Sequence, residues 1–141
     1  MDQKAMMEAR VWARVTGQKL ENNGETEDIS GFLRQEYADL QFYRCLYKKL
    51  PCNMVCRLIK LAEDTIKYLK TQYFVETGRC FCEKYSENVC ISCVCDALRM
   101  QYQSVQKRRN NYEKGCDKWE KAAYNKKCEE RILLELLQKV L

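Results

Sequence analysis

Residues 29–51 read ISGFLRQEYADLQFYRCLYKKLP and contain one hydrophobic seam that runs to the single proline of the chain. The seam steps by four and three residues in turn, through Ile29, Leu33, Glu36, Leu40, Tyr43, Tyr47 and Leu50. A period of about 3.5 residues is typical of helices that pack along one another in a bundle. Because Pro51 lacks a backbone N–H, we expect one helix to end before it and the next to open there.

Three further seams with the same spacing follow. They run through Val55, Leu58, Ala62, Thr65, Leu69 and Gln72, through Cys95, Leu98, Tyr102, Val105, Arg109 and Tyr112, and through Trp119, Ala122, Lys126, Glu129, Leu133, Leu136 and Val140. Gly78 and Gly115 lie just past two of these seams, where helices commonly end. The sequence therefore predicts an all-α, antiparallel four-helix bundle over residues 28–141, made of two helical hairpins, 28–78 and 93–141, and a cysteine-rich crossover, 79–92.

Residues 1–27 precede this bundle. The segment 5–15 is amphipathic and predicts a short helix, whereas GQKLENNGETE, residues 17–27, is polar, contains two glycines and predicts a linker. Thr26 and Asp28 are both candidates to cap the first helix of the bundle, since either side chain accepts a hydrogen bond from an early backbone N–H.

The composition restricts the chemistry. The chain has 141 residues, which suits one domain with one core, and it has no histidine. Without an imidazole, Ser-His-Asp and Cys-His catalysis and every metal site that needs a histidine ligand are excluded. Asp, Glu, Cys, Lys and Tyr remain as the groups that can carry chemistry.

Charge and hydropathy limit the partners. No stretch is long and apolar enough to cross a bilayer, and no signal-peptide run opens the chain, so we expect a cytoplasmic protein without a membrane partner. The net charge is +5, and the densest basic run, residues 107–109, lies inside a predicted helix without interleaved aromatic residues. We interpret this run as a solvated helix face and expect no nucleic-acid binding.

Several segments make the chain resemble the ferritin-like domains of the bacterial rubrerythrin type. They are ARVWARVTG at 9–17, FLRQEYADLQFYRCL at 32–46, the turn around Pro51, LAEDTIKYLKTQYFVETG at 61–78, ALRMQYQ at 97–103 and CEERILLELLQ at 128–138. The resemblance implies a four-helix bundle that pairs with a second copy through helix faces. It also implies a centre of two iron or manganese ions, held by a Glu from one helix and a Glu-x-x-His from the next in each half.

The ligand positions of that family are mostly replaced here. They match Glu36, Thr65, Tyr68, Val105, Glu129 and Ile132. Only Glu36 and Glu129 keep a ligand side chain, and two carboxylates are too few to hold two cations. The resemblance therefore implies a degenerate di-metal site, with Glu36 and Glu129 as its surviving ligand positions.

The two surviving carboxylates share their seams with cations. A lone buried carboxylate is costly, so it must be paired or protonated. We hypothesise that Glu36, Arg109, Lys126 and Glu129 form a buried ionic cluster. In the alternative interpretation, Arg109 and Lys126 extend to solvent at the seam edge. We expect the many tyrosines to fill the core with their hydroxyls at its rim.

The crossover contains a second candidate site. Cys80, Cys82, Cys90 and Cys93 form a C-x-C and a C-x-x-C pair, and thiolates bind zinc or iron without histidine. The alternatives are reduced thiols that act as small apolar side chains, and disulfides or redox sensing.

Three functions follow from these features. The first is a ferritin-like, rubrerythrin-related protein that has lost its di-iron centre and acts as a non-catalytic structural or interaction module, without a cofactor and as a homodimer. The second is an iron-binding ferritin-like protein in iron handling or peroxide defence, an oxidoreductase of the di-iron type. The third is thiol-based metal binding or redox sensing through the Cys80–Cys95 segment.

Overall fold

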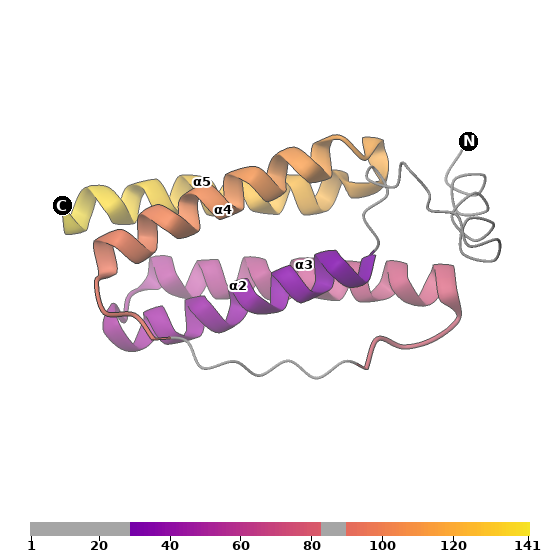
Figure 1. The fold of residues 1–141 in the computed structure, drawn as a ribbon, viewed down its shortest axis with the longest axis horizontal. Helices are drawn as coiled ribbons and strands as arrows, with labels where there is room; N and C mark the ends of the chain where they lie inside the picture. The colour runs from indigo at the N-terminus through magenta and orange to yellow at the C-terminus, as the bar shows by residue number, and fades with distance from the viewer. Residues whose placement is uncertain (1–28, 83–89) are drawn as a thin grey trace, which may run out of the picture.

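The computed structural model describes residues 29–82 and 90–141, and this part of the chain is all-helical (Figure 1). Its elements are α2 (Ile29–Lys49), α3 (Asn53–Thr77), α4 (Val94–Glu113), the short 3-10 helix η2 (Cys116–Trp119) and α5 (Glu120–Val140). The predicted N-terminal helix and linker, the candidate caps Thr26 and Asp28, and residues 83–89 of the crossover lie outside the described residues.

Proline and glycine mark the helix ends as predicted. Helix α2 ends at Lys49 and α3 begins at Asn53, so Pro51 lies in the turn between them. Gly78 closes α3 with a φ of 74°, a left-handed conformation that favours glycine, and its N–H donates to the carbonyl of Phe74 at 2.8 Å.

The turn between α4 and α5 depends on a close approach. A Cβ added to Gly115 would lie 2.0 Å from Cδ1 of Trp119, so no larger residue fits without displacing the indole. Trp119 is buried, and its ring lies 5.4 Å from that of Phe32 and 6.3 Å from that of Tyr112. Gly115 therefore ends α4 and also allows the tryptophan to join the core.

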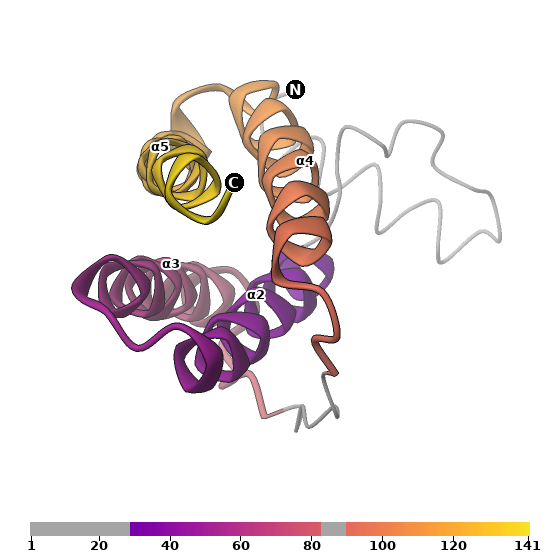
Figure 2. The same ribbon diagram turned by 90° about the vertical axis from the view of Figure 1, so that its left-hand side faces the viewer.

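The helices lie in two pairs. Helix α2 lies beside α3, α4 lies beside α5, and α3 also packs against α5 (Figure 2). The end view shows the α4–α5 pair above the α2–α3 pair. Helices α2 and α4 are joined by polar side chains, because Arg108 donates to Asp39 and Tyr112 donates to Glu36. Among the described helices, none is both long and apolar enough to span a membrane.

The core follows the predicted seams. Leucines from all four helices are fully buried: Leu33, Leu46, Leu58, Leu69, Leu98 and Leu133. Tyr47 is the clearest exception, because this predicted seam residue is 40% exposed near the end of α2. Charged residues of the seams, Glu36, Lys126 and Glu129, are as deeply buried as the leucines. The middle of the core is therefore polar, with apolar layers above and below it.

Candidate functional site

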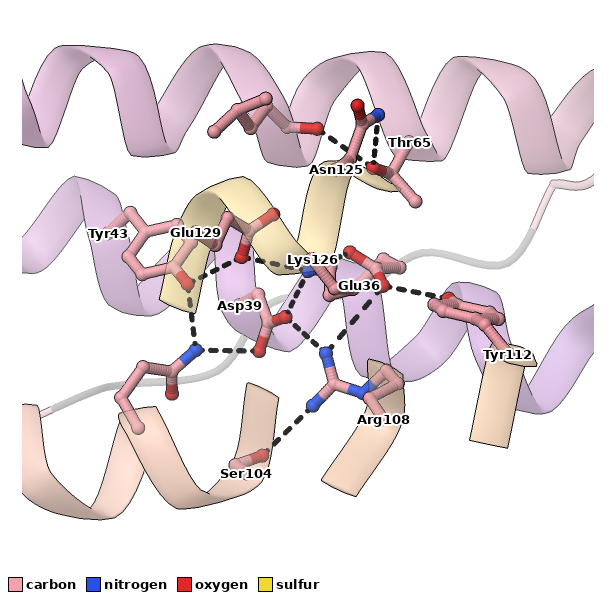
Figure 3. Close-up of polar contacts among 12 residues, drawn as sticks. Glu36, Asp39, Tyr43, Thr65, Ser104, Arg108, Tyr112, Asn125, Lys126 and Glu129 are labelled. Carbon is pink, nitrogen blue, oxygen red and sulfur yellow. Dashed lines mark hydrogen bonds and ion pairs between the residues drawn. The ribbon is translucent and has the colours of Figure 1, made fainter. Parts of the chain in front are cut away.

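Five charged side chains meet in the middle of the core. The charge cluster consists of Glu36 and Asp39 from α2, Arg108 from α4, and Lys126 and Glu129 from α5 (Figure 3). None of them is more than 6% exposed. Burial of an unpaired charge is costly, so the geometry of their pairing decides whether the core tolerates them.

Lys126 lies at the centre of the cluster. Its Nζ is 2.6 Å from Oε1 of Glu36, 2.8 Å from Oδ2 of Asp39 and 2.9 Å from Oε1 of Glu129. The ammonium donates hydrogen bonds to Asp39 and Glu129 and forms an ion pair with Glu36. Burial alone lowers the pKa of Lys126, but Asp39, Glu129 and Glu36 outweigh burial and raise it, so the side chain stays charged.

Arg108 supplies the second cation. Its Nη1 donates to Oδ2 of Asp39 and lies 3.7 Å from Oε2 of Glu36, while its Nη2 donates to Oγ of Ser104 at 3.0 Å. Burial opposes the charge, but the two carboxylates raise the pKa of Arg108 above its ordinary value. The guanidinium therefore holds α4 to both carboxylates of α2.

Two tyrosines donate to the carboxylates from opposite ends of the cluster. The hydroxyl of Tyr43 donates to Oε1 of Glu129 at 2.6 Å, and that of Tyr112 donates to Oε2 of Glu36 at 2.8 Å. Burial, followed by the adjacent carboxylate, raises the pKa of each phenol well above its ordinary value. Both tyrosines stay protonated donors. The prediction that tyrosine hydroxyls lie at the rim is wrong for these two.

Two carboxylate oxygens of the cluster, Oε1 of Glu36 and Oε2 of Glu129, are buried without a hydrogen bond in the described part of the chain, and of the two only Oε1 of Glu36 has an ion pair, with Lys126. The other oxygen of Glu129, Oε1, accepts from Tyr43 and Lys126. Burial raises the pKa of Glu129 to about 7, against the opposing effect of Lys126. Asp39 differs: burial works against its charge, but Lys126 and Arg108 lower its pKa. Protonation of Glu129 therefore removes one negative charge from the cluster.

The cluster confirms part of the sequence hypothesis and corrects the rest. Glu36, Lys126 and Glu129 are buried together as predicted, so Lys126 does not extend to solvent. Arg109 was the wrong arginine: it pairs with Glu130, and with Glu113 at 3.2 Å, at the edge of the α4–α5 pair.

Asp39 is a cluster member that the sequence reasoning missed. It lies three residues after Glu36, which places both carboxylates on one face of α2, and it accepts from Gln101 at 2.9 Å as well as from the two cations. The next residue, Leu40, fits the spacing of the hydrophobic seam, so the pattern does not point to Asp39. The signal that could have found it is the run of Glu36, Asp39 and Tyr43 at steps of three and four.

The other positions that the resemblance assigns to metal ligands make different contacts. Thr65 accepts from Nδ2 of Asn125 at 2.9 Å and donates to the carbonyl of Leu61 at 2.9 Å. The hydroxyl of Tyr68 donates to the carbonyl of Lys118. Val105 and Ile132 are apolar and buried. None of these four is directed at the cluster as an anionic ligand.

A di-metal centre does not fit these residues. Six ligands are expected for two cations, but the converging anions here are Glu36, Asp39 and Glu129, and Lys126 already contacts all three. In the described part of the chain, no three Cys, Asp or Glu side chains are grouped in a way that holds a metal ion. The cluster can fix the helices relative to one another, but it has no free ligand set for metal chemistry.

The predicted thiolate site is not assembled either. Cys80, Cys82, Cys90 and Cys93 are all exposed, and Sγ of Cys82 donates to the carbonyl of Cys80 at 3.4 Å. The four side chains are described, yet no three of them come together as metal ligands. The nine cysteines whose side chains are described are free thiols.

Comparisons of the chain with protein-family models, with curated proteins and with solved structures find no match.

Proposed function

We propose that this chain is a non-catalytic scaffold of the ferritin-like, rubrerythrin type, an antiparallel four-helix bundle in which side-chain cations replace the two metal ions of the family. The observation that carries the proposal is the ammonium of Lys126, placed between Glu36, Asp39 and Glu129. The short turn at Pro51 and the two stacked helix pairs support the bundle (Figure 2).

Built-in cations give such a scaffold a specific property. A bundle whose central carboxylates are balanced by metal ions depends on the supply of that metal, because binding and folding are linked. Lys126 and Arg108 balance these carboxylates from within the chain. The fold is then independent of metal, and the side chains that could serve as ligands are occupied by ion pairs and hydrogen bonds within the chain.

The proposal extends to the surface, because a scaffold acts through its faces. Large apolar side chains of α5 reach solvent at Tyr124, 64% exposed, and at Leu134, 43% exposed. The resemblance implies pairing through helix faces, so a homodimer remains part of the proposal. Sedimentation velocity of the wild type and of a Tyr124→Glu/Leu134→Glu variant tests it, since the variant should shift a dimer toward monomer.

The metal test uses the full chain, expressed with added iron and manganese and purified without a histidine tag. We expect less than about a tenth of an equivalent of either metal, and an unfolding midpoint that neither EDTA nor added Fe(II) changes. We also expect that Fe(II) added under air takes up oxygen no faster with the protein than in buffer alone.

The exposed thiols require a matched control. A variant with Cys80, Cys82, Cys90 and Cys93 replaced by serine removes the thiolates most able to bind metal adventitiously. If this variant still binds an equivalent of iron and its unfolding midpoint rises with added metal, the centre is a metal site and the proposal is wrong.

A further inference from the structure

A cavity lies beside the α2–α3 pair, and none of the charge-cluster residues lines it. It has a volume of about 490 Å³, and its apolar lining includes Leu40 of α2, Ile66 and Phe74 of α3, and Phe81 of the chain that follows α3. This volume lies within the range of roughly 300–1,000 Å³ in which proteins bind small molecules. The cavity is therefore large enough for an organic ligand.

The chain after α3 builds one wall of this cavity. The left-handed turn at Gly78 redirects the backbone, and Phe81 then packs against both helices. The ring of Phe81 stacks on Tyr37 at 6.2 Å and meets the edge of Tyr73 at 5.4 Å. The wall is thus held by aromatic contacts to α2 and α3, whereas Phe74 stays 53% exposed at the opening.

The charges at the opening are unbalanced. Glu63 lies 3.3 Å from Arg44, so its carboxylate is already paired. Lys67 and Lys70 lie on the same lining, three residues apart on α3, and both are exposed. In residues 29–82 and 90–141 neither ammonium has an ion pair. The opening therefore combines two available positive charges with an apolar interior.

We propose that this cavity binds an amphipathic carboxylate, a molecule with an apolar chain and one carboxylate head. The chain would lie against Leu40, Ile66 and Phe81, where it leaves water, and the head would lie between the ammonium groups of Lys67 and Lys70. An inorganic anion lacks the apolar chain and a neutral lipid lacks the charge, so neither matches both features. This inference is independent of the proposed scaffold function.

Titration calorimetry of the full chain with decanoate tests the proposal, with acetate and 1-decanol as probes that lack the chain or the charge. We expect one saturable site for decanoate, no binding of acetate and weaker binding of 1-decanol. A Lys67→Glu/Lys70→Glu variant should bind decanoate about tenfold more weakly. A Lys121→Glu/Lys127→Glu variant makes the same charge change on the exposed surface of α5 and should bind like the wild type.

A Phe81→Ala variant removes the aromatic wall and should also weaken decanoate binding, while its circular dichroism shows that the helices persist. Saturable binding that neither the lysine variant nor the wall variant alters would overturn the proposal. Absence of saturable decanoate binding would overturn it too. If the cavity instead serves a second copy of the chain, sedimentation velocity will show a dimer that Phe74→Asp disrupts and decanoate does not.

Discussion

The centre and the edge of the α4–α5 pair use the same residue types with opposite consequences. Arg108 and Arg109 are neighbours in sequence, but Arg108 is buried between Asp39 and Glu36, while Arg109 pairs with Glu130 in a half-buried position where its side chain is 19% exposed. An ion pair near water contributes little, because water solvates both charges almost as well. In the core each charge relies on its partner, so loss of one leaves the others buried and unpaired.

The largest effect is expected from removal of the central cation. Lys126→Met keeps the length of the side chain but leaves Glu36, Asp39 and Glu129 without their shared ammonium. We expect a loss of about 3–5 kcal/mol in the free energy of unfolding, measured by urea denaturation. Lys127→Met, one residue on and exposed, is the control and should change stability by less than about 0.5 kcal/mol. A loss of less than about 1 kcal/mol in Lys126→Met would show that the cluster is not a strong constraint.

The pH dependence of stability tests the buried charge cluster in a second way. The folded chain holds the proton of Glu129 with a pKa of about 7, whereas the ordinary value is 4.5. Stability from this group is therefore complete below about pH 4.5 and falls as the pH rises toward 7. We expect the free energy of unfolding to fall by on the order of 2–3 kcal/mol between pH 4.5 and 7.5, measured by urea denaturation.

Few other side chains of this protein titrate between pH 4.5 and 7.5. The chain has no histidine, the residue that normally titrates between pH 5 and 8. Asp39, whose pKa is lowered, affects stability only at more acidic pH, because it loses its stabilising charge as the pH falls below its ordinary value of 3.8. Glu129→Gln should flatten the profile, whereas Glu135→Gln on the exposed face of α5 should leave it unchanged. A slope that persists in Glu129→Gln would assign it to another group.

A smaller effect is expected at the tyrosines. Tyr112→Phe removes the hydroxyl that donates to Oε2 of Glu36 at 2.8 Å and leaves that buried oxygen with only the more distant Arg108. We expect a loss of about 1–2 kcal/mol by urea denaturation, since a buried acceptor loses its donor. Tyr124→Phe, on an exposed ring, is the matched control and should be neutral. Equal effects of the two substitutions would mean that the hydroxyl of Tyr112 does not stabilise the cluster.

The smallest effect is expected at the edge. Arg109→Ala removes a half-buried pair with Glu130 and a more exposed pair with Glu113. We expect a loss of about 1 kcal/mol, less than at Arg108 because the pair keeps some contact with water, and 0.5 M sodium chloride should reduce it. Arg108→Ala, measured beside it, should cost several times more and respond little to salt. If the two variants lose the same stability, burial does not separate the neighbouring arginines.

The sequence predicts the helices better than the members of the cluster. The four seams, Pro51 and Gly78 set the helix positions because apolar spacing and backbone chemistry are local properties. Which of the two arginines, Arg108 or Arg109, is buried does not follow from the local sequence. A seam of period 3.5 passes equally well through 105, 108 and 112 or through 105, 109 and 112, so only packing against α2 decides which arginine is buried.

The same ambiguity hides Asp39 beside Leu40. Both residues are buried, and the seam needs only one of them. A search for apolar spacing selects the leucine, although the aspartate is the residue that contacts both cations. Burial of the cavity wall at Phe81 was also beyond prediction, because it depends on the path of the chain after Gly78.

The charge cluster also divides unequally between the two halves of the chain. The first half, α2 and α3, contributes two carboxylates, both from α2, and no cation. The second half, α4 and α5, contributes both cations and one carboxylate. The contacts span 87 residues between Asp39 and Lys126. Each half alone would expose an apolar face with uncompensated charge, so we expect that neither half folds by itself. Fragments cut within the crossover should fold only on mixing, as complementary partners that select each other by opposite charge.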